Sequence, residues 1–376
     1  MNKLTKVAVA IGAALTAFGA HAQSNNPSPN VTVYGIVDAY VQSLRGDTTL
    51  HRVQSGGLNS SRFGLRGIED LGGGLRAFYT LEAGINVDDG SSAQGGVLFG
   101  RQALVGLGSA QFGQVSLGRQ YSSIYVATSA DFSAFSNSGA GPNTSLIGGF
   151  AGGYEPVRGA SLTGAPPGAG ATGNGGPARV NNSVRYESPT FAGLRVGALY
   201  GAGEVADNTS GQRLIDLFAR YSASIVDVLA SRVSDKAVGG TGTDATTTTL
   251  AAAFAFAEGH VYAGFMNVDD GRPANEDGRG YWLGGDYRIN RHLVRAQYIV
   301  NDPRTGHDTR TQAFGVGYEY DLSKRTALYG SLTRFANQAN AGSGGLGRWT
   351  AAIPTGLTSA SSNDLTELAA GIRHTF

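Results

Sequence analysis

Short segments of strictly alternating apolar and polar residues recur along this chain, and they constrain its fold more than any other feature. Between residues 75 and 85 every second side chain is apolar, while those between them include Arg76 and Glu82. The same period of two returns in residues 179–187 and 194–200. Successive side chains of a β-strand point to opposite faces, so each segment predicts a strand with one apolar and one polar face.

The N-terminus has the pattern of a cleaved export signal. Lys3 and Lys6 precede an apolar stretch, residues 7–20, which ends in a small-residue cleavage pattern. A membrane-spanning helix needs about 20 apolar residues, so an N-terminal anchor is the less favoured alternative. We therefore expect residues 1–22 to be a signal peptide and the mature chain to be residues 23–376.

The composition excludes several functional classes. Cysteine is absent, which excludes disulfides, thiolate metal sites and cysteine nucleophiles. Acidic residues number 28, and loss of the two lysines of the signal peptide leaves 27 basic residues, so nucleic-acid binding is not expected. The 58 glycines suit strands that are joined by turns.

The spacing of the turns separates a transmembrane barrel from a soluble β-sandwich, since both would show alternation. Short links occur at residues 69–74, 108–113, 188–193, 258–260, 289–292 and 320–324. Longer polar segments fall near residues 46–58, 88–96, 121–178, 204–211, 237–245, 269–277, 302–310 and 338–362. Outer-membrane barrels have short periplasmic turns and longer external loops, so the spacing favours a barrel.

The pattern predicts an all-β fold, a transmembrane antiparallel β-barrel of 16 strands. The expected strands are residues 31–45, 59–69, 74–87, 97–107, 112–120, 179–188, 193–203, 212–222, 224–235, 246–257, 260–268, 278–289, 292–301, 311–321, 325–337 and 363–376. An even number places both termini at one end, and this number encloses a lumen wide enough for water. Fourteen and eighteen strands are the alternatives.

Strand 97–107 fits the alternation least well. Arg101 has the same parity as its apolar neighbours Ala103 and Val105. This strand would therefore be covered on both faces, by a neighbouring subunit outside and a loop inside. Periodicity leaves the orientation of Arg101 open.

The C-terminal residues are the sharpest local signal. Leu368, Ile372 and Phe376 share one face of the last predicted strand, and the sequence ends on Phe376. An aromatic residue at this place suits the girdle at the membrane interface. The alternative is an ordinary edge strand that ends in phenylalanine.

Seven stretches occur together in a characteristic order. They are VTVYGIVDA (31–39), SSRFGLRGIEDLGGGL (60–75), FGRQA (99–103), FGQVSLGRQ (112–120), NNSVRY (181–186), LSKRTALYG (322–330) and GIRHTF (371–376). In them the chain resembles the general-diffusion porins of Gram-negative bacteria, in the β-proteobacterial branch.

The resemblance implies an outer-membrane homotrimer of 16-stranded barrels, surrounded by lipid and lipopolysaccharide. It implies that the third external loop, residues 121–178, folds into the lumen and narrows each pore. It further implies recognition of the last strand, with Phe376, by the barrel-assembly machinery. The loop departs from the family because residues 164–176 resemble a flexible insertion and only Asp131 and Glu155 are acidic.

The resemblance also implies arginines on the wall opposite this loop. The matching positions are Arg62, Arg101 and Arg179, with Glu82 beside them, and Asp131 is the candidate from the loop. Parity independently places Arg62, Arg179 and Glu82 in the lumen.

The charges of the lumen predict a mild preference for anions. Inward positions include Arg62, Arg66, Arg76, Arg179, Arg185 and Arg195 against Asp38, Glu82 and Glu187. Rings of arginine favour anions and rings of carboxylate favour cations. Each arginine has an alternative, structural role, in which it pairs with a carboxylate or a loop carbonyl and stiffens the wall.

Three functions are compatible with these features. They are a non-specific porin, a substrate-selective channel of the same fold, and a barrel that acts as an adhesin or enzyme. The sequence offers no set of residues that would supply the nucleophile, base and orienting group of a catalytic site. Its histidines and acidic residues do not have the spacing of metal ligands. We therefore expect a diffusion channel with no cofactor and no enzymatic activity.

Overall fold

The computed structural model describes residues 30–135, 139–142, 178–204, 207, 213–236, 244–269, 278–303, 310–337 and 364–376. The predicted signal peptide, Glu155 and the glycine-rich insertion 164–176 lie outside this part of the chain.

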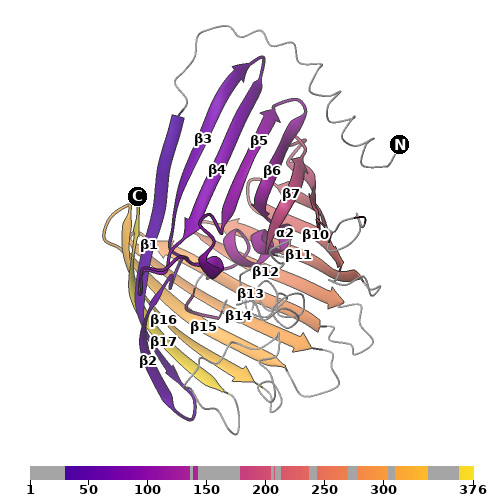
Figure 1. Ribbon diagram of the computed structural model, residues 1–376. Coiled ribbons are helices and arrows are strands. Elements are labelled where there is room, and N and C mark those ends of the chain that lie inside the picture. Colours follow the sequence, from indigo (N-terminus) through magenta and orange to yellow (C-terminus); the bar gives the residue numbers. More distant parts are fainter. Residues whose placement is uncertain are drawn as a thin grey trace.

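The described residues form one closed antiparallel barrel (Figure 1). Its strands are β1 Asn30–Arg45, β2 Thr49–Ser55, β3 Arg62–Gly72, β4 Leu75–Gly84, β5 Gln102–Ser109, β6 Gly113–Tyr121, β7 Arg179–Glu187, β8 Leu194–Gly201, β9 Leu214–Ser222, β10 Val226–Lys236, β11 Asp244–Phe256, β12 Gly259–Asp269, β13 Gly278–Ile289, β14 His292–Pro303, β15 Thr311–Asp321, β16 Thr326–Asn337 and β17 Leu365–Thr375. Each strand from β3 to β17 pairs with the next, and β1 closes the ring between β17 and β3. The predicted barrel of 16 strands is confirmed, because β2 pairs with β1 as an addition to this ring.

The strand β2 corrects one prediction, since residues 46–58 were expected to be an external loop. Half of the long strand β1 pairs with β3, and its other half pairs with β2 in a hairpin. In this hairpin Val53 lies opposite Val41, and both are exposed on the outer face. Because Thr49–Ser55 is mostly polar, its composition did not indicate a strand. It forms one because the C-terminal half of β1, residues 39–45, pairs with it.

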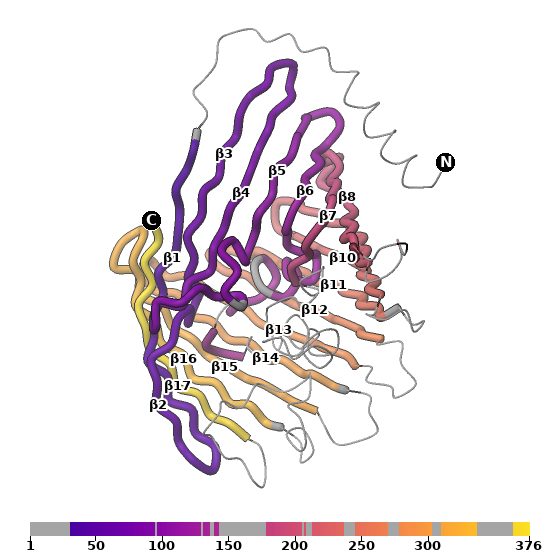
Figure 2. The backbone as a smooth tube through the Cα atoms, viewed as in Figure 1, coloured from indigo at the N-terminus to yellow at the C-terminus, as the bar shows by residue number. Residues whose placement is uncertain are grey.

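Short turns join neighbouring strands at one end of the barrel (Figure 2). The connections that join β3 to β4, β5 to β6, β7 to β8 and the later pairs at the same end are tight turns. Between β3 and β4, Gly72, Gly73 and Gly74 all have positive φ, a conformation in which glycine avoids a steric penalty. Porin-like barrels have such turns at the periplasmic end.

The two faces of the wall have opposite chemistry, as the alternation predicts. Leu368 and Ile372 on β17, and Phe376 directly after it, are 59%, 48% and 47% exposed on the outer face. The inner face carries charged groups that are nearly inaccessible, including Asp216 and Glu319. Apolar residues outside and polar residues inside indicate a barrel that stands in lipid, and exclude a soluble sandwich.

Phe376 lies on the outer face at the seam between the first and last strands. Its backbone exchanges two hydrogen bonds with Gly35, both of 3.1 Å. A Cβ atom at Gly35 would lie only 2.3 Å from Cζ of the Phe376 ring. The ring therefore covers Gly35, and the C-terminal residue takes part in closing the barrel.

The chain enters the lumen directly after β6. It forms the short helix α2, Ser123–Tyr125, and the single turn η2, Val126–Ala130. Another short turn, η1, occupies Gln94–Gly96 in the connection before β5. Figure 1 shows α2 inside the barrel wall.

Hydrogen bonds tie residues 121–135 and 139–142 to the inner face. The backbone N–H of Ser123 donates to Asp216 on β9 at 2.7 Å, and Trp282 Nε1 on β13 donates to the Phe132 carbonyl at 2.7 Å. Farther along, the N–H of Gly141 donates to Glu367 on β17 at 2.9 Å. The segment therefore runs along the inner face of the wall, and a hydrophobic core forms between it and the wall, around Ile124, Phe132 and inner residues of β8 to β17.

None of the helices in the described part of the chain is long and apolar enough to cross a membrane.

Candidate pore constriction

Three arginines come together where β3, β5 and β7 begin. Arg62 and Arg179 are the first residues of β3 and β7, and Arg101 immediately precedes β5. Parity left the orientation of Arg101 open because residues 97–107 were expected to be one strand. The regular strand begins only at Gln102, so Arg101 lies outside the alternation and its side chain reaches the inner face.

Glu82 is the centre of this cluster. Its carboxylate accepts hydrogen bonds from Arg101 Nε at 2.7 Å, from the Tyr121 hydroxyl at 2.8 Å and from the Tyr34 hydroxyl at 2.9 Å. Arg101 is fully buried, and its Nη2 also donates to the Tyr125 hydroxyl at 3.0 Å. Charge-assisted bonds of this kind are shorter and stronger than neutral ones, so Glu82 and Arg101 form a fixed pair.

Two stacked tyrosines position the third arginine. The rings of Tyr121, at the end of β6, and Tyr125, in α2, are 4.0 Å apart and within 5° of parallel. Cζ of Arg179 lies 5.6 Å and 5.1 Å from the two ring centroids. Cation–π contacts at such distances are worth about 0.5–2 kcal/mol, depending on desolvation. The first turn of the inserted segment therefore holds Arg179 without a carboxylate.

The cluster has more positive than negative charge. Arg62 Nε donates to the Ser60 carbonyl at 2.9 Å, and within the described part of the chain neither Arg62 nor Arg179 is in an ion pair. Glu82 compensates one guanidinium, which leaves an excess of two positive charges.

The positive charge of the cluster lowers the pKa of Tyr125. Burial raises the pKa of its phenol, but the guanidinium groups of Arg101, Arg179 and Arg62 outweigh the burial and hold the pKa below the ordinary value of a tyrosine.

The structure places Asp131 away from these contacts. Its carboxylate pairs with Arg220 Nη1 on β9 at 2.6 Å, and Arg220 also pairs with Asp227 on β10. No described contact joins Asp131 to Glu82 or to the three arginines. The predicted constriction set is thus divided, with Arg62, Arg101, Arg179 and Glu82 in one cluster and Asp131 in another.

The remaining predicted arginines line the inner face with different degrees of compensation. Arg66 lies over the Tyr34 ring at 5.1 Å, and Arg76 Nη2 donates to Gln114 at 3.3 Å. Arg185 and Arg195 share Glu187, at 2.5 Å and 3.6 Å.

Asp38 was predicted to face the lumen, and it lies on the inner face but is fully buried. Its carboxylate accepts hydrogen bonds from the N–H groups of Gly57, Leu58 and Asn59, all between 2.8 and 2.9 Å, and from the Tyr329 hydroxyl. It therefore anchors the segment after β2 instead of facing water.

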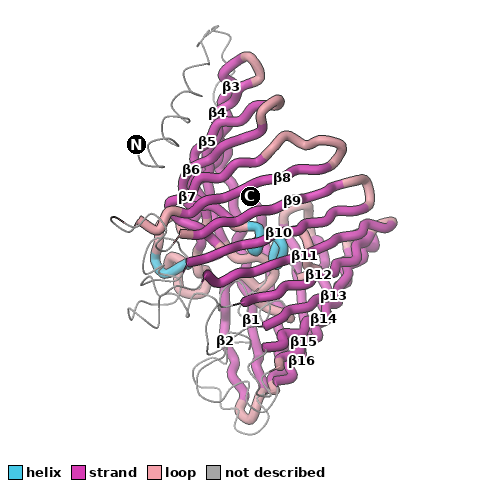
Figure 3. The backbone as a smooth tube through the Cα atoms, turned by 90° about the vertical axis from the view of Figure 1, so that its right-hand side faces the viewer, coloured by secondary structure: helices cyan, strands magenta, loops and turns pink. Residues whose placement is uncertain are grey.

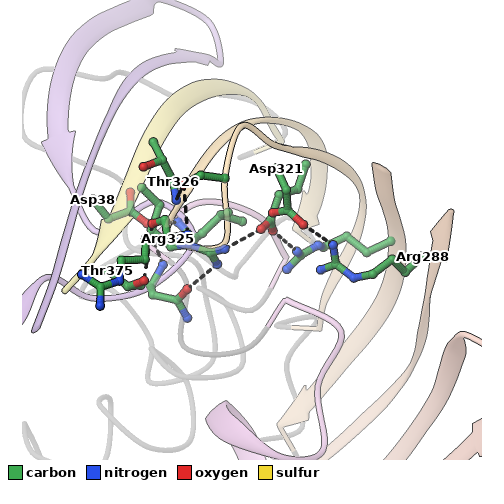
Figure 4. Close-up of polar contacts among 12 residues, drawn as sticks. Asp38, Arg288, Asp321, Arg325, Thr326 and Thr375 are labelled. Atoms are coloured by element: carbon green, nitrogen blue, oxygen red, sulfur yellow. Dashed lines mark hydrogen bonds and ion pairs between the residues drawn. The ribbon is translucent and has the colours of Figure 1, made fainter. Parts of the chain in front are cut away.

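Sequence reasoning missed a second charged cluster on the inner face of β13 to β17. Glu319 accepts from Arg295 Nη2 at 2.6 Å and from Arg373 Nη2 at 2.5 Å. Arg288 also pairs with Asp321, two residues from Glu319 (Figure 4). The sequence did contain a signal, because these charged residues occupy the inward-facing positions of the predicted strands.

Comparisons with known proteins agree with this architecture. Residues 7–340 match the family described as Gram-negative porin. Outer membrane porin protein 32 of Delftia acidovorans is 32% identical over 100% of both chains, and an outer membrane porin protein of Bordetella pertussis is 28% identical over 87% of this chain and 92% of that one. These relatives confirm the resemblance to β-proteobacterial porins.

Solved structures show the same fold. The anion-selective porin from Comamonas acidovorans has a TM-score of 0.73 and 29% identity, and covers 93% of this chain and 100% of that one. Salmonella typhi OmpF, with a TM-score of 0.66 at 14% identity over 93% and 98% of the two chains, supports the fold alone. This chain therefore belongs to the Gram-negative porin family and is an outer-membrane porin, a barrel through which small hydrophilic solutes and ions diffuse passively.

Proposed function

We propose that the channel has a mild preference for anions and that Arg62 and Arg179 cause it. The observation that carries this proposal is the excess of two positive charges around Glu82. Fixed charges at a constriction replace part of the hydration of an ion, so their sign favours counter-ions. Arg101 contributes less, because Glu82 compensates it.

A structural relative supports the same sign. The porin from Comamonas acidovorans is described as anion-selective, and it is 29% identical to this chain over most of its length. Its selectivity is a property of that protein, and it makes the same property here a reasonable expectation.

The test is the reversal potential of the purified protein in a planar bilayer under a salt gradient. We expect discrete conductance steps with an anion-sided potential, and a large loss of that potential in an Arg62→Ala/Arg179→Ala double variant. The matched control is Arg76→Ala/Arg195→Ala, which removes two inner-face charges near the short turns, where β4 and β8 begin. A potential that is cation-sided, or that falls equally in both variants, would contradict the assignment to the constriction.

We further propose that residues 121–178 form the constriction loop of each pore. The support is the course of residues 121–135 and 139–142 along the inner face, from β9 to β17. Deletion of residues 164–176 tests the contribution of the insertion, and single-channel conductance is the readout.

We also propose five further properties. They are cleavage after residue 22, assembly as a homotrimer, contact with lipopolysaccharide, recognition of Phe376 by the barrel-assembly machinery, and a lack of enzymatic activity. Family membership supports them. N-terminal sequencing of the mature protein, and its molar mass in detergent from light scattering, test the first two.

A further inference from the structure

One apolar side chain departs from the alternation of the barrel wall. Ile68 on β3 is 60% exposed, yet it has the parity of the inward residues Arg62 and Arg66. Every other exposed large apolar side chain on the described strands has outward parity. Ile68 therefore presents an apolar group to the water of the lumen, where no lipid covers it, and such exposure is a common mark of a binding surface.

Phe78 on β4 enlarges this apolar surface. It lies directly opposite Ile68 in the register of β3 and β4, so both side chains are on the inner face. Strands β3 to β6 lie side by side in Figure 3, and the Phe78 ring leans over Gly106 on β5, where a Cβ atom would lie 2.4 Å from its Cζ. The ring thus rests against the wall, and because it is only half-buried, part of it is open to the lumen.

Arg76 places a positive charge beside the Phe78 ring. The two residues share one face of β4, and their Cα atoms are about 7 Å apart along the strand. The Arg76 side chain also leans over β5, since a Cβ atom at Gly108 would lie 2.8 Å from its Nε. Its Nη2 donates one long bond, of 3.3 Å, to the neutral side chain of Gln114. A guanidinium has five N–H donors, so this exposed group can still bind an anion.

This surface has its own charge and is separate from the constriction. Asp70 lies opposite Arg76, but its carboxylate accepts a backbone N–H of the turn at 2.9 Å, and no ion pair joins the two residues within the described part of the chain. Along β4, Phe78 is six residues from Gly84, the partner of Arg62, which corresponds to about 20 Å. A solute at Phe78 would therefore lie near the short turns, beyond the reach of the constriction arginines.

We propose that Ile68, Phe78 and Arg76 form a second solute site, at the turn end of the lumen, for small aromatic carboxylates. The ring of the solute packs against Ile68 and Phe78, and its carboxylate pairs with Arg76. Guanidinium groups bind carboxylates in a bidentate manner, and two aromatic rings attract each other in offset-stacked or edge-to-face arrangements. The separation of about 7 Å between Phe78 and Arg76 suits a carboxylate that is attached directly to one ring.

The experiment measures how benzoate blocks the potassium chloride current of single channels in a planar bilayer. We expect Phe78→Ala to raise the half-blocking concentration of benzoate by about threefold or more, and Ile68→Thr and Arg76→Gln to raise it as well. Acetate has the charge without the ring, so its block should not respond to Phe78→Ala. Benzyl alcohol has the ring without the charge, so its block should not respond to Arg76→Gln. The matched control is Phe63→Ala, which removes an aromatic ring from the outer face of the same hairpin.

Two results would overturn the proposal. One is a half-blocking concentration that is the same in wild type and Phe78→Ala, or that rises equally in Phe63→Ala. The other is a benzoate block that Arg62→Ala/Arg179→Ala abolishes by itself, which would place the solute at the constriction. The ratio between the proteins with and without Phe78→Ala should persist in that double variant, so this site and the proposed anion preference can fail independently. If Phe78→Ala forms no channels, Ile68→Thr gives the same test with the ring over Gly106 intact.

Discussion

At the scale of single residues, the pore depends on which charges are compensated. Arg101 and Arg220 each have a carboxylate partner, whereas Arg62 and Arg179 rest on a carbonyl and on two aromatic rings. A paired charge creates a weak field at a distance, because its partner cancels it. A count of inward arginines therefore overstates the cationic character of the lumen.

Neutralisation of Glu82 tests this view. We expect Glu82→Gln to increase the anion preference, since the local excess of positive charge rises, and to destabilise the cluster by about 3–5 kcal/mol, because the buried Arg101 loses its counter-charge. Reversal potential and thermal unfolding in detergent measure the two effects. Asp131→Asn is the comparison, and an equal or larger gain in selectivity there would contradict the separation of the two clusters.

At the scale of strands and loops, alternation predicted most of the wall because each strand is apolar on one face only. It failed where contacts across the fold decide the conformation. Thr49–Ser55 forms a strand because the C-terminal half of β1 pairs with it. The Arg101 side chain points inward because Glu82 lies opposite the start of β5. Neither contact leaves a periodic signal in its own segment.

The inserted segment was predicted from resemblance, and its anchors could not be predicted from local sequence. The hydrogen bond from Trp282 Nε1 to the Phe132 carbonyl joins residues 150 positions apart. We expect Trp282→Phe to weaken this anchor by about 1 kcal/mol and to increase open-channel noise in single-channel recordings. Tyr281→Phe is the control, because its side chain lies on the outer face, and equal noise in both variants would mean that this bond does not hold the segment.

The seam between β1 and β17 gives a second prediction at this scale. Removal of the ring in Phe376→Ala uncovers Gly35, and we expect a loss of about 1 kcal/mol because the ring is already half exposed. Folding efficiency into liposomes measures it. Phe112→Ala removes another exposed aromatic ring, in the turn before β6, so a larger defect in that variant would contradict a special role of the seam.

At the scale of the whole molecule, net charge and selectivity are separate properties. The full chain carries 29 basic and 28 acidic side chains, and removal of the proposed signal peptide would leave 27 basic ones, so the proposed anion preference cannot come from the total charge. It must come from the placement of a few uncompensated groups in the narrow part of the lumen, and such a field is short-ranged in salt solution.

This short range makes the preference depend on ionic strength. The Debye length falls from about 10 Å at 0.1 M salt to about 3 Å at 1 M, so mobile ions screen the field of Arg62 and Arg179 across the water-filled lumen. We expect the ratio of anion to cation permeability, measured from reversal potentials at a constant concentration ratio, to fall toward the ratio of the free ion mobilities as total salt rises. The Arg62→Ala/Arg179→Ala variant should stay near the mobility ratio throughout. A wild-type preference that is constant over this range would instead indicate selection by direct coordination, because screening leaves contacts at hydrogen-bond distance largely intact.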